Sequence, residues 1–133
     1  KLAQLPGGDA ASGTVIVAIQ LTNTSAQPCQ LNGYPTFTLA AGGRSLSATI
    51  QHGGMPIAPI NEAPQPVTVK PATRAGFLLV YQNRPASGTG TCSTATTMSL
   101  KLGSATVSGG VQVLVCGPAM KVSPYVAGNR LAT

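Results

Sequence analysis

Glycine and proline are spread so densely through this chain that they limit the secondary structure it can form. There are 16 glycines and 11 prolines among 133 residues, and one or the other interrupts almost every window of ten. Both destabilise the interior of an α-helix, glycine through its backbone entropy and proline through its missing N–H group. No stretch keeps apolar residues at the spacing of an amphipathic helix. We therefore predict an all-β protein of short strands separated by turns.

Alternation of apolar and polar residues locates the expected strands. The clearest is residues 14–21, where Val15, Val17 and Ile19 share one face. Residues 77–81 are apolar on both faces, which is typical of a central strand. Shorter strands are expected at 29–31, 36–40, 44–50, 67–69, 98–102, 111–116 and around 121–126. Of these candidate segments we expect seven or eight to form strands, and turn signals about every eight to twelve residues favour an antiparallel sandwich of two sheets.

The domain organisation is simple. The length suits one domain with a sizeable core, and no internal repeat divides it. We expect a flexible N-terminal segment at 1–13, a single β-sandwich domain at 14–126 and a C-terminal tail at 127–133. Residues 55–66 hold four prolines and should form an extended loop or a protected edge. Residues 83–97, rich in glycine, serine and threonine, should form a long surface connection.

The charge balance is sparse and basic. Eight lysines and arginines face two acidic residues, for a net charge of +6. A surface that meets water mainly through neutral polar groups favours an extracytoplasmic protein, secreted or at the cell envelope. The positive field would attract anionic wall polymer or lipid, or would serve solubility alone. Basic residues do not interleave with aromatic ones, so no specific nucleic-acid site is expected.

The sequence shows no membrane span or export signal. No apolar run reaches the roughly 18 residues of a transmembrane span. The first eight residues also lack the apolar segment of a signal peptide. A secreted protein would therefore be represented here in a mature or trimmed form.

The three cysteines allow at most one disulfide within the chain. From the residues alone, Cys29, Cys92 and Cys116 could pair in any of three ways, or remain buried thiols. The composition favours a disulfide, because it points to an oxidising compartment. No C-x-x-C string occurs, and His52, the sole histidine, stands 23 residues from the nearest cysteine. We expect neither a zinc site nor any other cofactor.

Residues suited to acid–base catalysis are few. A histidine base needs an orienting carboxylate, and the chain has only Asp9 and Glu62. Ser45 or Ser47 with His52 and Glu62 would make a formal triad, but no G-x-S-x-G string accompanies them. We predict that the protein is not an enzyme and that His52 is an exposed loop residue.

Short strings in the first third of the chain are more specific. They are Leu21-Thr-Asn-Thr-Ser25, Pro28-Cys29 and Leu31-Asn-Gly-Tyr-Pro35, followed later by the pattern Val67-x-Val-x-Pro71. In this block the chain resembles DUF4232, a secreted actinobacterial domain of unknown function, over residues 14–122. The resemblance implies an immunoglobulin-like sandwich that is exported and often lipid-anchored or wall-associated. It implies no activity.

The resemblance also bears on the cysteines. Members of the family usually carry four, the first just ahead of the opening strand, but residues 1–13 contain none. Carried over position by position, Cys92 and Cys116 match the second pair, and Cys29 matches the partner of the missing cysteine. Either a cysteine upstream of Lys1 pairs with Cys29, or Cys29 is a free buried thiol.

Two local motifs within this block have competing interpretations. Asn23-Thr-Ser25 fits a glycosylation sequon, but we favour an Asx or Ser/Thr turn in which the side chains bond the backbone. Tyr34-Pro35 could hold a cis peptide or a binding aromatic. We favour a ring that covers one end of the core.

Together these features predict a non-enzymatic binding or interaction module, monomeric and secreted or held at the cell envelope. Its partner would be an unknown protein or an anionic cell-wall polymer, and its full-length form could associate with the membrane peripherally or through a lipid anchor. The loops at 53–66 and 83–97 are the expected contact surface. Candidate binding residues are His52, Met55, Ile57, Lys70, Arg74 and Arg84. The alternative is a structural spacer or assembly subunit that pairs through an exposed strand edge.

Overall fold

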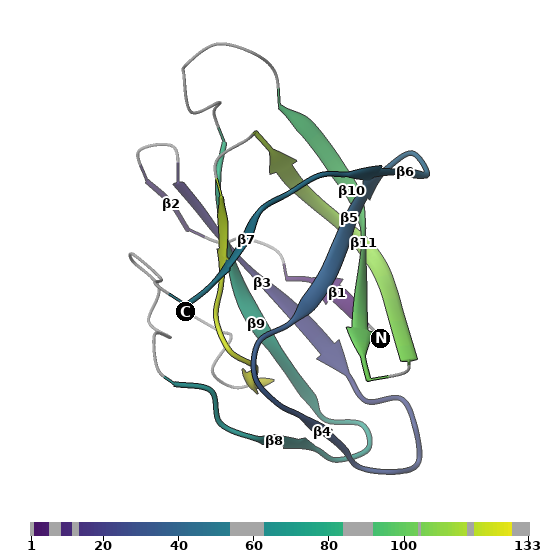
Figure 1. The fold of residues 1–133 in the computed structure, drawn as a ribbon. Coiled ribbons are helices and arrows are strands. Elements are labelled where there is room, and N and C mark those ends of the chain that lie inside the picture. Colours follow the sequence, from purple (N-terminus) through teal and green to yellow (C-terminus); the bar gives the residue numbers. More distant parts are fainter. Residues whose placement is uncertain are drawn as a thin grey trace.

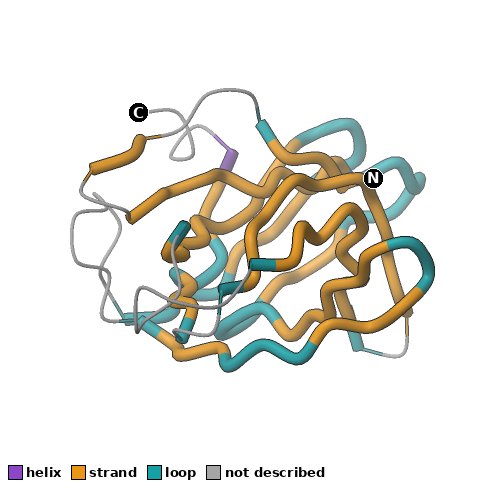
Figure 2. The backbone as a smooth tube through the Cα atoms, turned by 90° about the horizontal axis from the view of Figure 1, so that it is seen from above, coloured by secondary structure: helices purple, strands orange, loops and turns teal. Residues whose placement is uncertain are grey.

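The fold is all-β, as predicted. The computed structural model describes residues 2–5, 9–11, 14–53, 63–83, 92–103, 105–116 and 119–128. Within these ranges there are thirteen strands and no α-helix. Figures 1 and 2 show that strands make up most of the described backbone. None of this described backbone forms a helix that could cross a membrane.

The strands follow one another along the whole chain. They are β1 (Leu2–Gln4), β2 (Asp9–Ala11), β3 (Thr14–Thr22), β4 (Cys29–Leu31), β5 (Thr36–Ala41), β6 (Arg44–Leu46), β7 (Ile50–His52), β8 (Val67–Val69), β9 (Arg74–Gln82), β10 (Ser93–Leu102), β11 (Ala105–Val115), β12 (Met120–Val122) and β13 (Val126–Ala127).

These strands form three hydrogen-bonded sheets rather than two. A seven-stranded sheet has the order β1-β3-β9-β12-β7, with β2 also beside β3 and β13 also beside β9. A four-stranded sheet has the order β11-β10-β5-β6, and β4 pairs with β8 in a separate two-stranded ribbon. The pairing of β12 with β7 is parallel, whereas the others are antiparallel.

The prediction of seven or eight strands in two antiparallel sheets is therefore wrong in its strand count, its sheet count and one strand direction. Residues 44–50 were expected to form one strand, but β6 pairs with β5 while β7 pairs with β12 in the other large sheet. Exposed residues 47–49 carry the chain between the two sheets. Short strands that change sheet have no distinct apolar period, because only three residues lie in each.

The strands β3 and β9 form the centre of the seven-stranded sheet, with Thr14 opposite Gln82 and Thr22 opposite Arg74. The prediction of a central strand at 77–81 is confirmed. Phe77 and Leu79 face the main core, which they share with Leu39, Met98 and Leu100 of the four-stranded sheet. The other face of β9 packs into a smaller cluster of Ile16, Leu78, Val80 and Val126. Apolar residues on both faces of β9 are thus explained by burial on both sides.

The start of the chain belongs to the fold, which corrects the expected flexible segment at 1–13 for the residues described there. Both β1 and β2 pair with the outer edge of β3. Leu2 is buried, and Gln4 uses its side chain to accept from the Gln112 N–H (2.8 Å) and donate to the Gln112 carbonyl (3.4 Å). The contact requires glycine at 109, because a Cβ atom there would collide with the Leu2 carbonyl oxygen.

The strand expected around 121–126 is divided in two. β12 ends at Val122 and β13 begins at Val126, and both pair with β9. Between them, the buried Ser123 accepts a hydrogen bond from the Leu78 N–H at its Oγ (2.9 Å) and donates its own N–H to the Leu78 carbonyl (3.0 Å). The side chain therefore satisfies a backbone donor that the interruption would otherwise leave unpaired. Ala127 of the expected tail lies within β13, and residues 129–133 lie outside the described ranges.

A disulfide joins Cys92 to Cys116, which is the pairing that the resemblance implies. The register of β10 and β11 places Ser93 opposite Val115, so the cysteines that flank this pair meet directly beyond it. Cys29 is a free thiol and is exposed. The alternative of a buried thiol at Cys29 is therefore wrong. In β4 the side chain of Leu31 is buried, whereas those of Cys29 and Gln30 are exposed.

Candidate ligand-binding site

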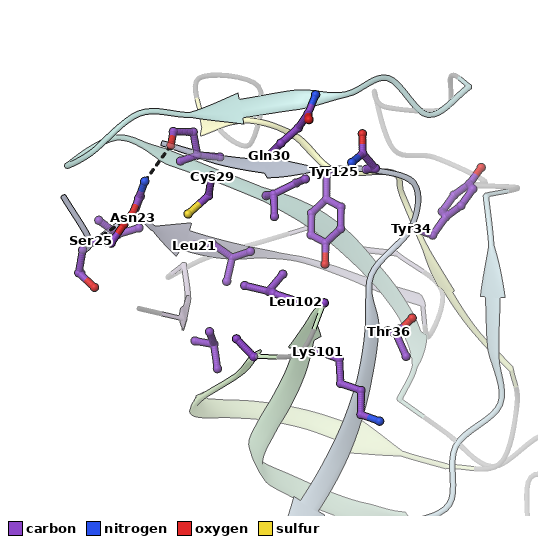
Figure 3. A pocket seen from close by; sticks show the side chains of 18 residues that line it. Leu21, Asn23, Ser25, Cys29, Gln30, Tyr34, Thr36, Lys101, Leu102 and Tyr125 are labelled. Atoms are coloured by element: carbon purple, nitrogen blue, oxygen red, sulfur yellow. Dashed lines mark hydrogen bonds between the residues drawn. The ribbon is translucent and has the colours of Figure 1, made fainter. Parts of the chain in front are cut away.

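A cavity of about 720 Å³ opens at one end of the fold, where the two large sheets meet the β4–β8 ribbon. This volume falls within the roughly 300–1,000 Å³ typical of small-molecule sites. The cavity draws residues from segments that are far apart in the sequence (Figure 3). Its lining is Leu21, Thr22, Asn23, Thr24, Ser25, Cys29, Gln30, Leu31, Asn32, Tyr34, Thr36, Val69, Lys101, Leu102, Gly103, Ala105, Val107 and Tyr125.

Part of the cavity wall is aliphatic. Leu21, at the end of β3, lies on the strand face that also carries Val17 and Ile19 into the core. Leu31 of β4 also lines the cavity, and Leu102 lines it from the end of β10. Because Leu102 is only partly buried against the core, part of its surface is open to the cavity. Such a wall favours an apolar ligand or an apolar part of a larger one.

Asn23 fixes the loop that forms one rim. Its Nδ2 group donates to the carbonyls of Gln27 and Val69, both at 2.8 Å. Its Oδ1 atom accepts from the Ser25 N–H (3.0 Å) and the Ser25 hydroxyl (2.7 Å). Its backbone is hydrogen-bonded to Ala72 and Thr73 of the next turn. The predicted Asx turn is confirmed, and use of the amide by the protein itself argues against the glycosylation sequon.

Replacing Asn23 by alanine is expected to lower the free energy of unfolding by about 3 kcal/mol, because it deletes four side-chain hydrogen bonds and leaves buried partners unsatisfied. Urea unfolding followed by circular dichroism measures the change. The matched control is Asn32→Ala, at an exposed position on the same cavity. Similar losses in both variants would contradict a special structural role for Asn23.

Tyr125 brings a polar group into this apolar wall. The residue is 5% exposed, and its ring meets Phe77 edge to face, with the ring centroids 5.9 Å apart. Its hydroxyl makes no hydrogen bond within the part of the chain that the structure describes, and Figure 3 shows it pointing into the cavity toward the end of β10. Every fully buried polar side-chain atom of the described residues has a hydrogen-bond partner. Because the Tyr125 hydroxyl has none, it is not fully buried and is open to the cavity. Burial raises the pKa of Tyr125 to about 12.

That pKa predicts a loss of stability in alkali. The folded protein holds the Tyr125 proton up to about pH 12, whereas the unfolded chain releases it near its ordinary value of 10.0. Stabilisation that is fully present below pH 10.0 is therefore lost as the pH rises through that interval, by about 1 to 2 kcal/mol because water in the open cavity screens part of the effect. Burial also raises the pKa of Tyr81, so the two tyrosines act in the same direction.

The contribution of Tyr125 is isolated by comparing urea unfolding of the native chain and of Tyr125→Phe between pH 9 and 12. Titration of the other groups is common to both proteins. We expect the two stabilities to be similar at neutral pH and to diverge above pH 10.0, with the phenylalanine variant the more stable. Parallel curves across the whole range would contradict the raised pKa.

The charge of the site is positive. Lys101, which is exposed at the end of β10, is the only charged residue in the described lining, and no carboxylate or histidine lies beside it. Figure 3 shows its ammonium group at the rim, turned away from Tyr125. No group of three or more metal-binding side chains occurs among the described residues. The described lining therefore offers a hydrogen-bond donor and a cation to a ligand, but no acid–base pair for catalysis.

The binding residues predicted from sequence lie outside this lining. His52 is exposed at the end of β7, where it stacks on Tyr34 with a centroid distance of 4.5 Å. Lys70 and Arg74 flank the turn that is bonded to Asn23, and both are exposed without lining the cavity. The other predicted residues, Met55, Ile57 and Arg84, lie outside the described residues, as does Glu62 of the formal triad.

The Tyr34-Pro35 motif agrees with its simpler interpretation. The described chain contains no cis peptide bond. Pro35 is fully buried, and Tyr34 packs partly against the core while lining the cavity. The ring thus covers one end of the core, and it also orients the His52 ring on its outer side.

The sequence signal that could have located the cavity was the block of strings on which the family resemblance rests. Nine of the 18 lining residues come from the strings between residues 21 and 35. They are Leu21, Thr22, Asn23, Thr24, Ser25, Cys29, Leu31, Asn32 and Tyr34. The remaining residues include Lys101 and Tyr125, which sequence alone does not place beside this block.

Comparison with known proteins gives one match. The family model described as a domain of unknown function, DUF4232, covers residues 2–126. No curated protein and no solved structure matches the chain.

Proposed function

Because the chain belongs to the DUF4232 family, whose description assigns no function, we propose one from the geometry of the cavity. The protein is a non-enzymatic binding module, secreted or held at the cell envelope, that takes its ligand between the ends of its sheets. The observation that carries the proposal is a cavity of about 720 Å³ that combines apolar side chains with hydrogen-bonding groups and one cation. This combination is the usual composition of a small-molecule site.

Two further features support this proposal over catalysis in the cytoplasm. The described lining holds no carboxylate or histidine, and a tyrosine with a pKa of about 12 is not a base at neutral pH. The Cys92–Cys116 disulfide suggests an oxidising, extracytoplasmic environment. The core shared by the two large sheets supports an immunoglobulin-like packing as the scaffold that carries the site.

The test places a single tryptophan at the cavity, which is practicable because the chain has none. Ala105, at the start of β11, is exposed and lines the cavity, so Ala105→Trp should fold normally. The control is Thr94→Trp, exposed on β10 and roughly 20 Å away along the strands. The neutral dye N-phenyl-1-naphthylamine, which fluoresces in apolar surroundings, serves as the general ligand.

We expect energy transfer to bound dye from Ala105→Trp and much less from Thr94→Trp. Vesicle-free fractions of the cell envelope should displace the dye at low salt and also near 0.15 M, where charges are screened beyond about 8 Å. Equal transfer from both reporters, or no dye binding at all, would contradict a ligand site in the cavity. Dye that no envelope fraction displaces would contradict the role at the envelope.

A further inference from the structure

We propose that the ligand is a single-chain amphiphile with an anionic head, such as a fatty carboxylate. This inference rests on the proposed function and names the chemistry of its ligand. The aliphatic chain lies against Leu21, Leu31 and Leu102, and the acidic head is held by the Tyr125 hydroxyl and the Lys101 ammonium.

The buried tyrosine supplies the first argument. The Tyr125 side chain is buried, but its hydroxyl is open to the cavity and has no hydrogen-bond partner among the described residues. It points into the cavity (Figure 3). Because burial keeps its pKa near 12, the group stays protonated at neutral pH and acts as a donor. A carboxylate oxygen is the acceptor that gains most from such a donor, because the hydrogen bond is charge-assisted.

The charge of the lining supplies the second argument. Lys101 immediately precedes Leu102 at the end of β10, and the Tyr125 hydroxyl points toward that end. Its ammonium group is exposed on a flexible stem, so it can turn over a head group bound at the rim. The described lining has no carboxylate to repel an anion or attract a cation. The head that fits this chemistry is therefore anionic.

The shape of the site favours one dispersed molecule over a bilayer surface. The cavity is the size of a small-molecule pocket. Its rim is formed by exposed polar residues, Thr24, Ser25, Gln30 and Asn32, and not by the apolar side chains that insert into lipid. A membrane would meet this polar rim without reaching the leucines behind it.

The experiment displaces N-phenyl-1-naphthylamine from the folded protein with three ten-carbon amphiphiles in monomeric form. Decanoate, decanol and decyltrimethylammonium share one chain and differ in the charge of the head. At pH 7 and about 0.15 M salt, we expect decanoate to bind about tenfold more tightly than decanol, with the ammonium compound the weakest. The cavity reporter Ala105→Trp confirms where the dye is bound.

Three variants assign the preference to the site. Lys101→Gln and Tyr125→Phe should each weaken decanoate binding about fivefold and leave decanol binding within about twofold. Both should fold, because one side chain is exposed and the other hydroxyl has no partner. Arg44→Gln removes the same charge from an exposed hairpin outside the cavity and should change decanoate binding less than about twofold.

Each other outcome has a distinct meaning. Equal binding of decanoate and decanol would overturn the anionic head while leaving the cavity as a binding site. Equal losses in Lys101→Gln and Arg44→Gln would overturn the local role of Lys101 in favour of the general positive field. Displacement by phosphatidylglycerol vesicles but not by decanoate would overturn the single-molecule ligand. Failure of the dye to reach the cavity at all would instead be a failure of the proposed function.

Discussion

Replacing Phe77 by alanine is expected to lower the free energy of unfolding by about 4 kcal/mol, through lost apolar burial and the cavity left behind. Phe77 is fully buried in the middle of β9. Its ring stacks on Phe37 of the four-stranded sheet at a centroid distance of 5.8 Å and meets Tyr125 edge to face. The Phe77 ring therefore connects the central strand β9 to the four-stranded sheet and to Tyr125, which lines the cavity. Urea unfolding at neutral pH measures the loss.

The control removes the other ring of the stacked pair. Phe37 is only partly buried on β5, so Phe37→Ala should cost clearly less, about 2 kcal/mol. If Phe77→Ala cost no more than Phe37→Ala, the central position assigned to Phe77 would be wrong.

Reducing the Cys92–Cys116 disulfide is expected to destabilise the protein by about 3 kcal/mol on the chain-entropy model. The bond joins residues 24 apart, which close the hairpin of β10 and β11 at its open end. Unfolding curves with and without dithiothreitol measure the difference, and a Cys92→Ala, Cys116→Ala double variant should reproduce it.

Cys29 provides the matched control for the disulfide. Its thiol is exposed and unpaired, so Cys29→Ser should leave stability unchanged and should be as sensitive to reduction as the native chain. A reductant effect that disappears in Cys29→Ser would place Cys29 in the bond and overturn the pairing.

The two long central strands were predictable because each carries enough alternating residues to show a period. β3 and β9 have nine residues each, and their apolar side chains are buried on the expected faces. The start of the chain was not predictable, since β1 and β2 have three residues each and gain their structure by pairing with β3. The division of 44–50 between two sheets likewise depends on tertiary pairing, which the local alternation of apolar and polar residues does not reveal.

The candidate site was predictable only in part. The strings around Asn23 and Tyr34 are specific in the sequence, and they form about half of the cavity lining. No pattern in the sequence assigns a binding role to Lys101, or to Tyr125 in the last predicted strand. Both reach the cavity because the ends of the two large sheets meet there. The predicted binding residue His52 lies instead outside the lining, stacked on Tyr34.

The pairing of β3 with β9 has a consequence for how quickly the protein folds. The two strands are far apart in the sequence. Thr14 of β3 and Gln82 of β9, which also share a side-chain hydrogen bond, are separated by 68 positions. The entropy of closing such a loop is lost before the contacts across it form, so topologies of this kind fold in milliseconds to seconds. Until the fold forms, the apolar side chains on both faces of β9 are exposed to water and to other unfolded chains. Refolding after rapid dilution from urea should therefore be slow, and its yield should fall as the protein concentration rises.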